Sequence, residues 1–256
     1  MPIDNNPNPE YKRAMVVVAH PDDAEYGCSG TVAQWCSNGW EVVYVLCTDG
    51  SKGSDDPEMT PERLTEIRYQ EQEDAAKILG LKTVEYLGYP DAYLTPSLEL
   101  RKDITRQIRK HKPDVLITTA PFRTLGQNYG SSHPDHIAAG EATLSSIYPT
   151  ARDRLTFPEL LEEGFEPHKV REAWVMSRED ADHFNEISEE NMDTALKALA
   201  AHTSQVPPEA IERERKIVEE EYRTDIGGDK RYYDELSKFT FKNSRLLKRK
   251  PIGDIE

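Results

Sequence analysis

The chain has 256 residues, enough to bury a large core in one α/β domain with a small extension. Its formal charge is −15, with 47 Asp and Glu residues against 32 Lys and Arg, so its field repels nucleic acids and anionic membranes, and neither is an expected partner. No apolar run approaches the ~20 residues that span a bilayer, and the first residues have neither the basic nor the apolar region of a signal peptide.

The three cysteines, Cys28, Cys36 and Cys47, are odd in number and lack the Cys-x-x-Cys spacing of redox motifs and zinc ribbons. They therefore predict no disulfide framework. A reducing cytoplasm is the expected location.

The chain alternates short apolar runs with stretches of helical spacing. The apolar runs predict strands at 14–19, 41–47, 83–87, 114–119 and 171–177. The helical stretches predict helices at 27–38, 61–79, 97–111, 134–147, 188–202 and 207–224. This alternation predicts an α/β, Rossmann-like fold, in which a mainly parallel sheet has helices on both faces and a helical extension follows at the C-terminus.

Three segments are expected along the chain. Residues 1–12 form an N-terminal extension, residues 13–205 one α/β domain, and residues 206–256 a charged helical extension packed on or near that domain. The helix expected at 207–224 is dense in charges of both signs, which is typical of a solvated helix face.

Two similar tetrapeptides, His20-Pro-Asp-Asp23 and His133-Pro-Asp-His136, carry most of the functional signal. Each places metal-binding side-chain types beside a stiff proline, and each comes after a run that predicts a buried strand. In an open parallel sheet both would lie at the rim outside the carboxyl ends of the strands, where such folds bind ligands. A single His-Pro-Asp is more often an ordinary turn. Two of them, with complementary residue types, predict a divalent metal site.

The residue types match what a zinc-dependent hydrolase needs: about three protein ligands, an open position for water and a nearby base. His20 and Asp23 are three residues apart in a turn and can converge on one ion, and His136 supplies a third ligand from the other loop. Zn²⁺ is the expected cofactor, and the same side chains also accept Fe²⁺, Co²⁺ or Mn²⁺. Asp22 is next to a ligand but free, which suits it as the general base on the water that the metal binds.

His133 and Asp135 are expected to act across the site from the base. A protonated imidazole at His133 can stabilise a developing oxyanion. Asp135 can orient His133 and raise its pKa, which would keep the imidazole charged near neutral pH.

Together these residues resemble the LmbE/PIG-L family of zinc-dependent N-acetylglucosaminyl deacetylases. The resemblance begins with Ala19-His-Pro-Asp-Asp23 and continues with His133-Pro-Asp-His136. Further matches are Glu25, Gly27, Thr48-Asp-Gly-Ser51, Arg68-Tyr-Gln-Glu71, Leu87-Gly-Tyr-Pro-Asp91 and His202-Thr-Ser-Gln205. The similarity extends over roughly residues 14 to 205, and the paired motifs in this order are specific.

The resemblance implies the same division of roles: three metal ligands, one base and an oxyanion-side pair at the positions named above. It also implies a sugar contact at Arg68, which from sequence position alone would be an ordinary helix pair with Glu71. Ser51 lies in a glycine-flanked turn and is either a hydrogen-bond partner of the sugar or a plain loop serine. His202 and Gln205 are expected to be structural, docking the C-terminal helix.

The chain departs from the family pattern at one position. Some members carry a tyrosine two residues before the first histidine of the second motif, where its hydroxyl can polarise the substrate carbonyl. Here that position is Ser131, and Tyr129 lies two residues earlier. Either Tyr129 takes that role in contacting the substrate, or His133 and the metal suffice.

The expected function is metal-dependent removal of the acetyl group from an N-acetylglucosamine-type sugar or glycoconjugate. Relatives in the family are often homo-oligomers, so a homo-oligomer is also expected here. An amidase of the same family acting on a thiol or other glucosaminyl conjugate is the first alternative, and a metal-binding protein without catalysis is the second. A nucleotide-dependent oxidoreductase is disfavoured because Gly27-Cys-Ser-Gly30 lacks the Gly-x-Gly-x-x-Gly spacing of a dinucleotide-binding turn.

Overall fold

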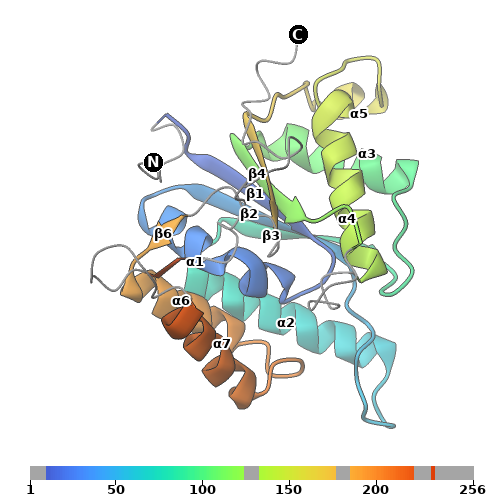
Figure 1. Cartoon of the computed structure of the whole chain (residues 1–256). Coiled ribbons are helices and arrows are strands. Elements are labelled where there is room, and N and C mark those ends of the chain that lie inside the picture. Colours follow the sequence, from blue (N-terminus) through green and yellow to red (C-terminus); the bar gives the residue numbers. More distant parts are fainter. Residues whose placement is uncertain (1–9, 124–132, 177–184, 222–231, 234–256) are drawn as a thin grey trace.

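The computed structural model describes residues 10–123, 133–176, 185–221 and 232–233 of the chain. Its centre is a five-stranded sheet with the order β3-β2-β1-β4-β5, in which all neighbouring strands are parallel (Figure 1). The strands are β1 (Arg13–Val18), β2 (Glu41–Thr48), β3 (Thr83–Tyr89), β4 (Val115–Thr119) and β5 (Glu172–Met176). All five predicted strands are confirmed, and their ends differ from the expected ones by no more than two residues.

The central strand β1 is paired along both edges, with β2 on one side and β4 on the other. Its side chains alternate between the two layers of the core, because successive residues of a strand point to opposite faces. Val16 and Val18 belong to one apolar cluster, and Met15 and Val17 to the other; all four are fully buried. Burial on both faces explains the continuous apolar sequence from which this strand was predicted.

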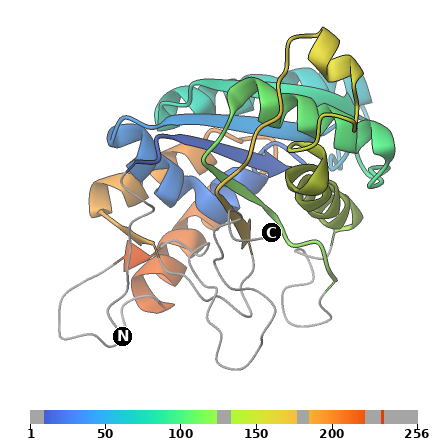
Figure 2. The same cartoon turned by 90° about the horizontal axis from the view of Figure 1, so that it is seen from above.

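Helices cover both faces of the sheet, as predicted. One face is covered by α1 (Asp23–Ser37), α2 (Pro61–Leu79) and α6 (Glu189–Leu199), and the other by α3 (Leu98–His111) and α4 (Pro134–Ser145) (Figure 1). Figure 2 views the same two layers from a second direction. The fold is therefore the α/β, Rossmann-like arrangement expected from the sequence.

The ends of α2 follow directly from local sequence. The Thr60 side chain accepts a hydrogen bond from the Arg63 N–H at 3.2 Å, and Pro61 occupies the first turn, where its missing N–H has no cost. The helix ends at Gly80, whose φ of 78° lies in the left-handed region that glycine adopts readily. These signals are contained in the sequence, and α2 covers the residues that were predicted.

The first helix begins earlier than expected, at Asp23 instead of residue 27. Gly27, the first residue of the predicted helix, lies in the second turn of α1. A Cβ at Gly27 would lie 2.2 Å from the Met176 sulfur, so glycine here permits close packing of α1 on the end of β5. The early start places Asp23 and Glu25 in the first turn of the helix.

Several short elements were not predicted. They are the π-helical turn η2 (Ser146–Thr150), helix α5 (Glu159–Glu162), and the antiparallel pair β6 (Glu186–Ile187) and β7 (Tyr232–Tyr233). Each is too short to show a periodicity in the sequence.

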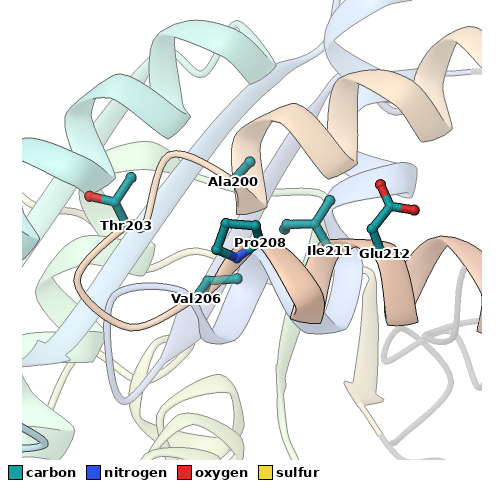
Figure 3. A pocket seen from close by; sticks show the side chains of 6 residues that line it. All are labelled: Ala200, Thr203, Val206, Pro208, Ile211 and Glu212. Carbon is teal, nitrogen blue, oxygen red and sulfur yellow. The ribbon is translucent and has the colours of Figure 1, made fainter.

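Helix α7 (Pro208–Glu221) follows α6 and packs against it. Leu199, Val206 and Ala210 form a small apolar cluster at this junction. Beside the cluster is a pocket of about 350 Å³, seen in Figure 3. Its lining residues are Ala200, Thr203, Val206, Pro208, Ile211 and Glu212. They are mainly apolar, so the pocket does not contain the metal-binding side chains predicted above.

The division of the chain into an N-terminal extension, a domain and a C-terminal extension stays a prediction. Within the described residues, no helix is both long enough and apolar enough to cross a bilayer.

Candidate metal centre

The two predicted tetrapeptides meet at the carboxyl ends of β1 and β4, the adjacent strands at the middle of the sheet. The helix after β1 covers one face and the helix after β4 covers the other. This is the topological switch point of an open α/β sheet, and the diverging connections leave a crevice there for a ligand. The structure therefore brings His20 and His136 together although 116 residues separate them.

The side chains of the three predicted ligands lie close together. His20 Nδ1 lies 3.2 Å from His136 Nε2, His136 Nε2 lies 2.9 Å from Asp23 Oδ1, and His20 Nδ1 lies 3.5 Å from Asp23 Oδ2. A tetrahedral zinc ion with bonds of about 2.0–2.1 Å has ligand atoms about 3.3 Å apart. These three side chains therefore fit a divalent metal.

The other ring nitrogen of His20 faces two carboxylates. His20 Nε2 lies 3.0 Å from Asp91 Oδ1 and 3.3 Å from Asp135 Oδ2. Carboxylates at this nitrogen favour the tautomer with its proton on Nε2, which leaves the Nδ1 lone pair for the metal. This carboxylate–histidine arrangement supports His20 as a ligand through Nδ1.

In the described part of the chain, two groups of three side chains each place one ligand atom per residue within 4.8 Å of one another. They are His20 with His133 and His136, and His20 with Asp91 and Asp135. The second group is a poorer candidate, because both oxygens of Asp135 already accept main-chain hydrogen bonds, from Ala92 at 2.7 Å and Leu94 at 3.2 Å.

The charges of this cluster are strongly coupled. Burial alone would lower the pKa of His20, but the carboxylates of Asp23, Asp135 and Asp91 outweigh it and hold that pKa well above its usual value. Burial would raise the pKa of Asp23, but His136 and His20 outweigh it and hold the pKa well below its usual value. Asp23 is thus ionised, as a metal ligand must be, and a metal competes with a proton for His20.

The Asp135 carboxylate acts to raise the pKa of His133 as expected, but it does not contact the His133 ring. This fully buried carboxylate contacts His20 and the main chain of Ala92 and Leu94. The main-chain N–H of Asp135, in contrast, donates to His133 Nδ1 at 3.2 Å. The ring of His133 therefore accepts a hydrogen bond from the backbone of α4, and the carboxylate contacts His20.

The positive effect of Asp135 and Asp23 on the pKa of His133 is outweighed by opposing effects. Its pKa is lowered by burial first, and then by the positive charges of His20 and His136. The Asp135 N–H occupies Nδ1, so a neutral imidazole carries its proton on Nε2. His133 can donate a hydrogen bond from Nε2 without being charged.

Asp22 lies at the N-terminus of α1 in a strained conformation, with φ at 90° and ψ at −27°. A non-glycine residue in this region costs about 1–3 kcal/mol and persists where its surroundings fix it. The Asp22 N–H donates to Gln72 Oε1 at 3.4 Å, and Arg68 donates to its carboxylate at 3.4 Å. Burial raises the pKa of Asp22 to about 7, against the opposing effect of Arg68.

Arg68, expected to contact a sugar, is 5% exposed and directs its donors to the protein. Its guanidinium donates to the carbonyls of Pro21 at 2.7 Å and Gly50 at 3.1 Å, as well as to Asp22. It therefore ties the loop after β2 to the loop after β1. Ser51, also expected to contact a sugar, is buried next to this junction, with its N–H donating to Asp49 at 3.0 Å.

Tyr129, the remaining predicted substrate contact, and Ser131 lie outside the described residues.

The structure adds one residue that the sequence analysis noted only as part of a motif. Asp91 follows β3, lies 3.0 Å from His20, and accepts a hydrogen bond from the Lys52 N–H. Its pKa is lowered because His20 and Arg68, with the Lys52 N–H, outweigh burial. The same rule that predicted the other loops, a carboxylate just after a buried strand, could have identified it.

The amino-acid sequence is similar to a known protein family and to several characterised proteins. The family model PIG-L, described as GlcNAc-PI de-N-acetylase, matches residues 15–147. Diacetylchitobiose deacetylase of Thermococcus kodakarensis is 30% identical over 208 residues, which cover 81% of this chain and 75% of that protein. A probable N-acetyl-alpha-D-glucosaminyl L-malate deacetylase 2 of Bacillus anthracis is 29% identical over 214 residues, covering 80% and 86% of the two chains.

A solved structure has a similar fold. The N,N'-diacetylchitobiose deacetylase from Pyrococcus horikoshii, in complex with an inhibitor, matches with a TM-score of 0.77 and 29% identity. The match covers 88% of this chain and 82% of that one. The similarity in fold therefore extends over most of this chain.

Proposed function

Since the chain belongs to the PIG-L (LmbE-like) family of deacetylases, we propose that it is a metal-dependent amide hydrolase that removes the acetyl group from an N-acetylglucosamine-type sugar or glycoconjugate. One observation carries this proposal most directly: the donor atoms of His20, Asp23 and His136 lie 2.9–3.5 Å apart, with Asp22 beside them. Zinc is the proposed metal, because two histidines and one carboxylate are a common catalytic zinc set.

The metal would be held by His20 Nδ1, His136 Nε2 and Asp23. When bound there, a divalent metal polarises a carbonyl and makes water more acidic. Asp91 and Asp135 keep the proton of His20 on Nε2, so that Nδ1 is available as a ligand.

Asp22 is proposed as the general base. Its pKa of about 7 is near the optimum for accepting a proton at neutral pH, because the carboxylate is both populated and basic enough. Asp22 takes the proton of the attacking water and returns a proton to the departing amine. Acetate and a free amino sugar are the products.

His133 is proposed to stabilise the oxyanion as a neutral hydrogen-bond donor. Its ring centroid lies 4.9 Å from that of His20 and 5.2 Å from that of His136, so it borders the cluster. The proton on Nε2 can be donated to the carbonyl oxygen of the substrate as negative charge develops there.

Arg68 is proposed to support the reaction mainly by fixing the Asp22 loop, with Ser51 and Tyr129 kept as proposed substrate contacts. The buried position of Arg68 and its bonds to Pro21 and Gly50 support this role.

The function is tested by measuring acetate release from a panel of N-acetylglucosaminides that includes diacetylchitobiose, before and after treatment with a chelator. We expect release from at least one sugar, loss of release after chelation and recovery on addition of Zn²⁺. Full activity in metal-free protein, confirmed by elemental analysis, would contradict the metal-dependent mechanism. Absence of release from the whole panel would contradict the proposed substrate class.

Two further proposals concern the whole protein, which we expect to be a homo-oligomer located in the cytoplasm. The first rests on resemblance to the family and the second on the cysteine pattern. Light scattering of the purified protein measures its stoichiometry, and a monomer would contradict the first proposal.

A further inference from the structure

A row of buried polar side chains links Asp22 to the segment that joins α6 and α7. The Asp22 N–H donates to Gln72 Oε1 at 3.4 Å, and Gln72 Nε2 donates to Glu25 Oε1 at 2.9 Å. The other oxygen of Glu25 lies 3.4 Å from His202 Nε2. Gln72 and His202 have no exposed surface, and Glu25 is almost fully buried.

The charge on Glu25 gives His202 an electrostatic role. A buried carboxylate is costly unless a charge or hydrogen-bond donors compensate it. Burial alone would lower the pKa of His202, but Glu25, followed by Asp22 and Glu71, outweighs it and raises that pKa. His202, 3.4 Å from Glu25, is thus favoured as a cation that balances this carboxylate.

The segment that contains His202 also has docking contacts that do not involve the imidazole. Glu71 on α2 accepts hydrogen bonds from Thr203 Oγ1 at 2.9 Å, from the Ser204 N–H at 2.7 Å and from Ser204 Oγ at 2.7 Å. These three bonds already hold the segment on α2. The imidazole of His202 is therefore available for a second role.

We propose that His202 is a positioning residue for the general base, acting through Glu25 and Gln72 on the strained main chain of Asp22. The φ of 90° at Asp22 requires surroundings that fix it, and the Gln72 amide supplies one of those contacts. Without His202, Glu25 loses its cationic partner, and the Glu25–Gln72 bond that orients the amide changes with it. Since His202 lies beyond residues 15–147, the segment after the matched family region takes part in catalysis.

The experiment compares His202→Asn with Ser204→Ala in the full-length zinc-loaded protein, and it rests on the proposed function of Asp22. We expect His202→Asn to lower kcat for acetate release by about tenfold or more, with KM within about twofold and zinc content unchanged. Ser204→Ala removes a docking bond without touching Glu25, so it should lower the melting temperature and leave kcat near that of the wild type. Equal kcat in the two variants would overturn the proposal.

Gln72→Met tests the same row from its other end, whether or not His202→Asn folds. It removes both amide hydrogen bonds at similar volume, and we expect the same loss of kcat at unchanged KM. In the double variant the two losses should not add, because both act through one contact to Asp22. Additive losses, or a Gln72→Met variant with wild-type kcat, would contradict the proposal.

A structural measurement keeps this inference separate from the proposed function. If the wild type released no acetate from any sugar, the function would fail, and crystal structures of the wild type and His202→Asn would decide the positioning role. We expect a changed Asp22 main chain in the variant. An unchanged Asp22, still in contact with Gln72 and Arg68, would overturn the role without reference to turnover.

Discussion

Two adjacent carboxylates, Asp22 and Asp23, have opposite electrostatic surroundings. Asp23 contacts His20 and His136, which hold its pKa well below the usual value, so it stays ionised. Asp22 turns away in a left-handed conformation, and burial raises its pKa to about 7. Neighbouring carboxylates whose pKa values are pushed apart are suited to different tasks, in our proposal a metal ligand and a base.

The assignment of Asp22 predicts both a loss of rate and a change in pH dependence. Asp22→Asn should lower kcat by about 10²–10⁴-fold while zinc stays bound, because a positioned base contributes about that much. In the wild type the carboxylate must be deprotonated, so kcat/KM should fall as pH drops through the pKa of Asp22. A bound cation stabilises the carboxylate, which puts this midpoint at or below about 7.

Acetate release between pH 5 and 9, with zinc measured by elemental analysis, checks this prediction. Asp74→Asn, a change at an exposed carboxylate on α2, serves as the control and should match the wild type. Near-normal kcat in Asp22→Asn would remove Asp22 from the mechanism.

Substitution of Arg68 can show whether this residue positions the Asp22 loop or binds the substrate. Its bonds to Pro21, Gly50 and Asp22 predict that Arg68→Lys, which cannot make all three, lowers kcat and the melting temperature with little change in KM. Steady-state kinetics and thermal unfolding measure both effects. A large rise in KM with normal kcat would instead support the sugar contact implied by the family resemblance.

At the scale of elements, the metal centre depends on how closely α4 approaches the end of β4. A Cβ at Gly140 would lie 2.3 Å from the Thr119 carbonyl oxygen, so only glycine permits this approach. Thr119 Oγ1 also donates to the His136 carbonyl at 2.6 Å, which fixes the first turn of the helix. The position of the ligand His136 thus depends on a glycine one turn away that contributes no chemistry.

Gly140→Ala should therefore weaken metal binding as well as the fold. Pushing α4 from the strand should cost about 1–3 kcal/mol of stability, the usual range for overpacking, and should move His136 relative to His20. Chemical denaturation and zinc titration measure the two effects. Glu141→Ala, at the next and exposed position of α4, is the control and should change neither. Wild-type zinc affinity in Gly140→Ala would show that helix position and ligand position are not coupled.

At the scale of the whole molecule, the metal would join parts of the chain on opposite faces of the sheet. His20 and Asp23 belong to the β1–α1 connection, whereas His136 belongs to α4 on the other face. A metal that binds the folded state alone stabilises it by mass action. The metal is therefore expected to stabilise the fold as well as to take part in catalysis.

Removal of the metal should lower the melting temperature. At a free metal concentration 100 times Kd the stabilisation is about 2.7 kcal/mol, or roughly 5–10 °C for a protein of this size. Thermal unfolding with and without a chelator measures it. His136→Ala is the matched control, because a variant that has lost a ligand should respond much less to chelation. An equal response in both proteins would place the stabilising ion elsewhere.

The sequence determined the strands, most helix positions and the proximity of the three proposed ligands. Periodicity, caps such as Thr60 and buried strands ending at one rim are local signals, which is why α2 and the His20, Asp23 and His136 cluster could be predicted. Gly27 shows the limit of such signals. A glycine is favoured at this position because a Cβ would meet the side chain of Met176 on β5, a strand far away in the sequence.

Only the tertiary structure decided which partner each polar side chain takes. Asp135 faces His20 instead of its sequence neighbour His133, and His202 reaches Glu25, because the fold brings together groups that are far apart in the chain. A sequence motif specifies residue types and spacing, but hydrogen bonds and pKa values depend on distance, burial and direction in three dimensions. The residue types that gather at the rim of the sheet could be predicted from the motifs, whereas the partners of each side chain could not.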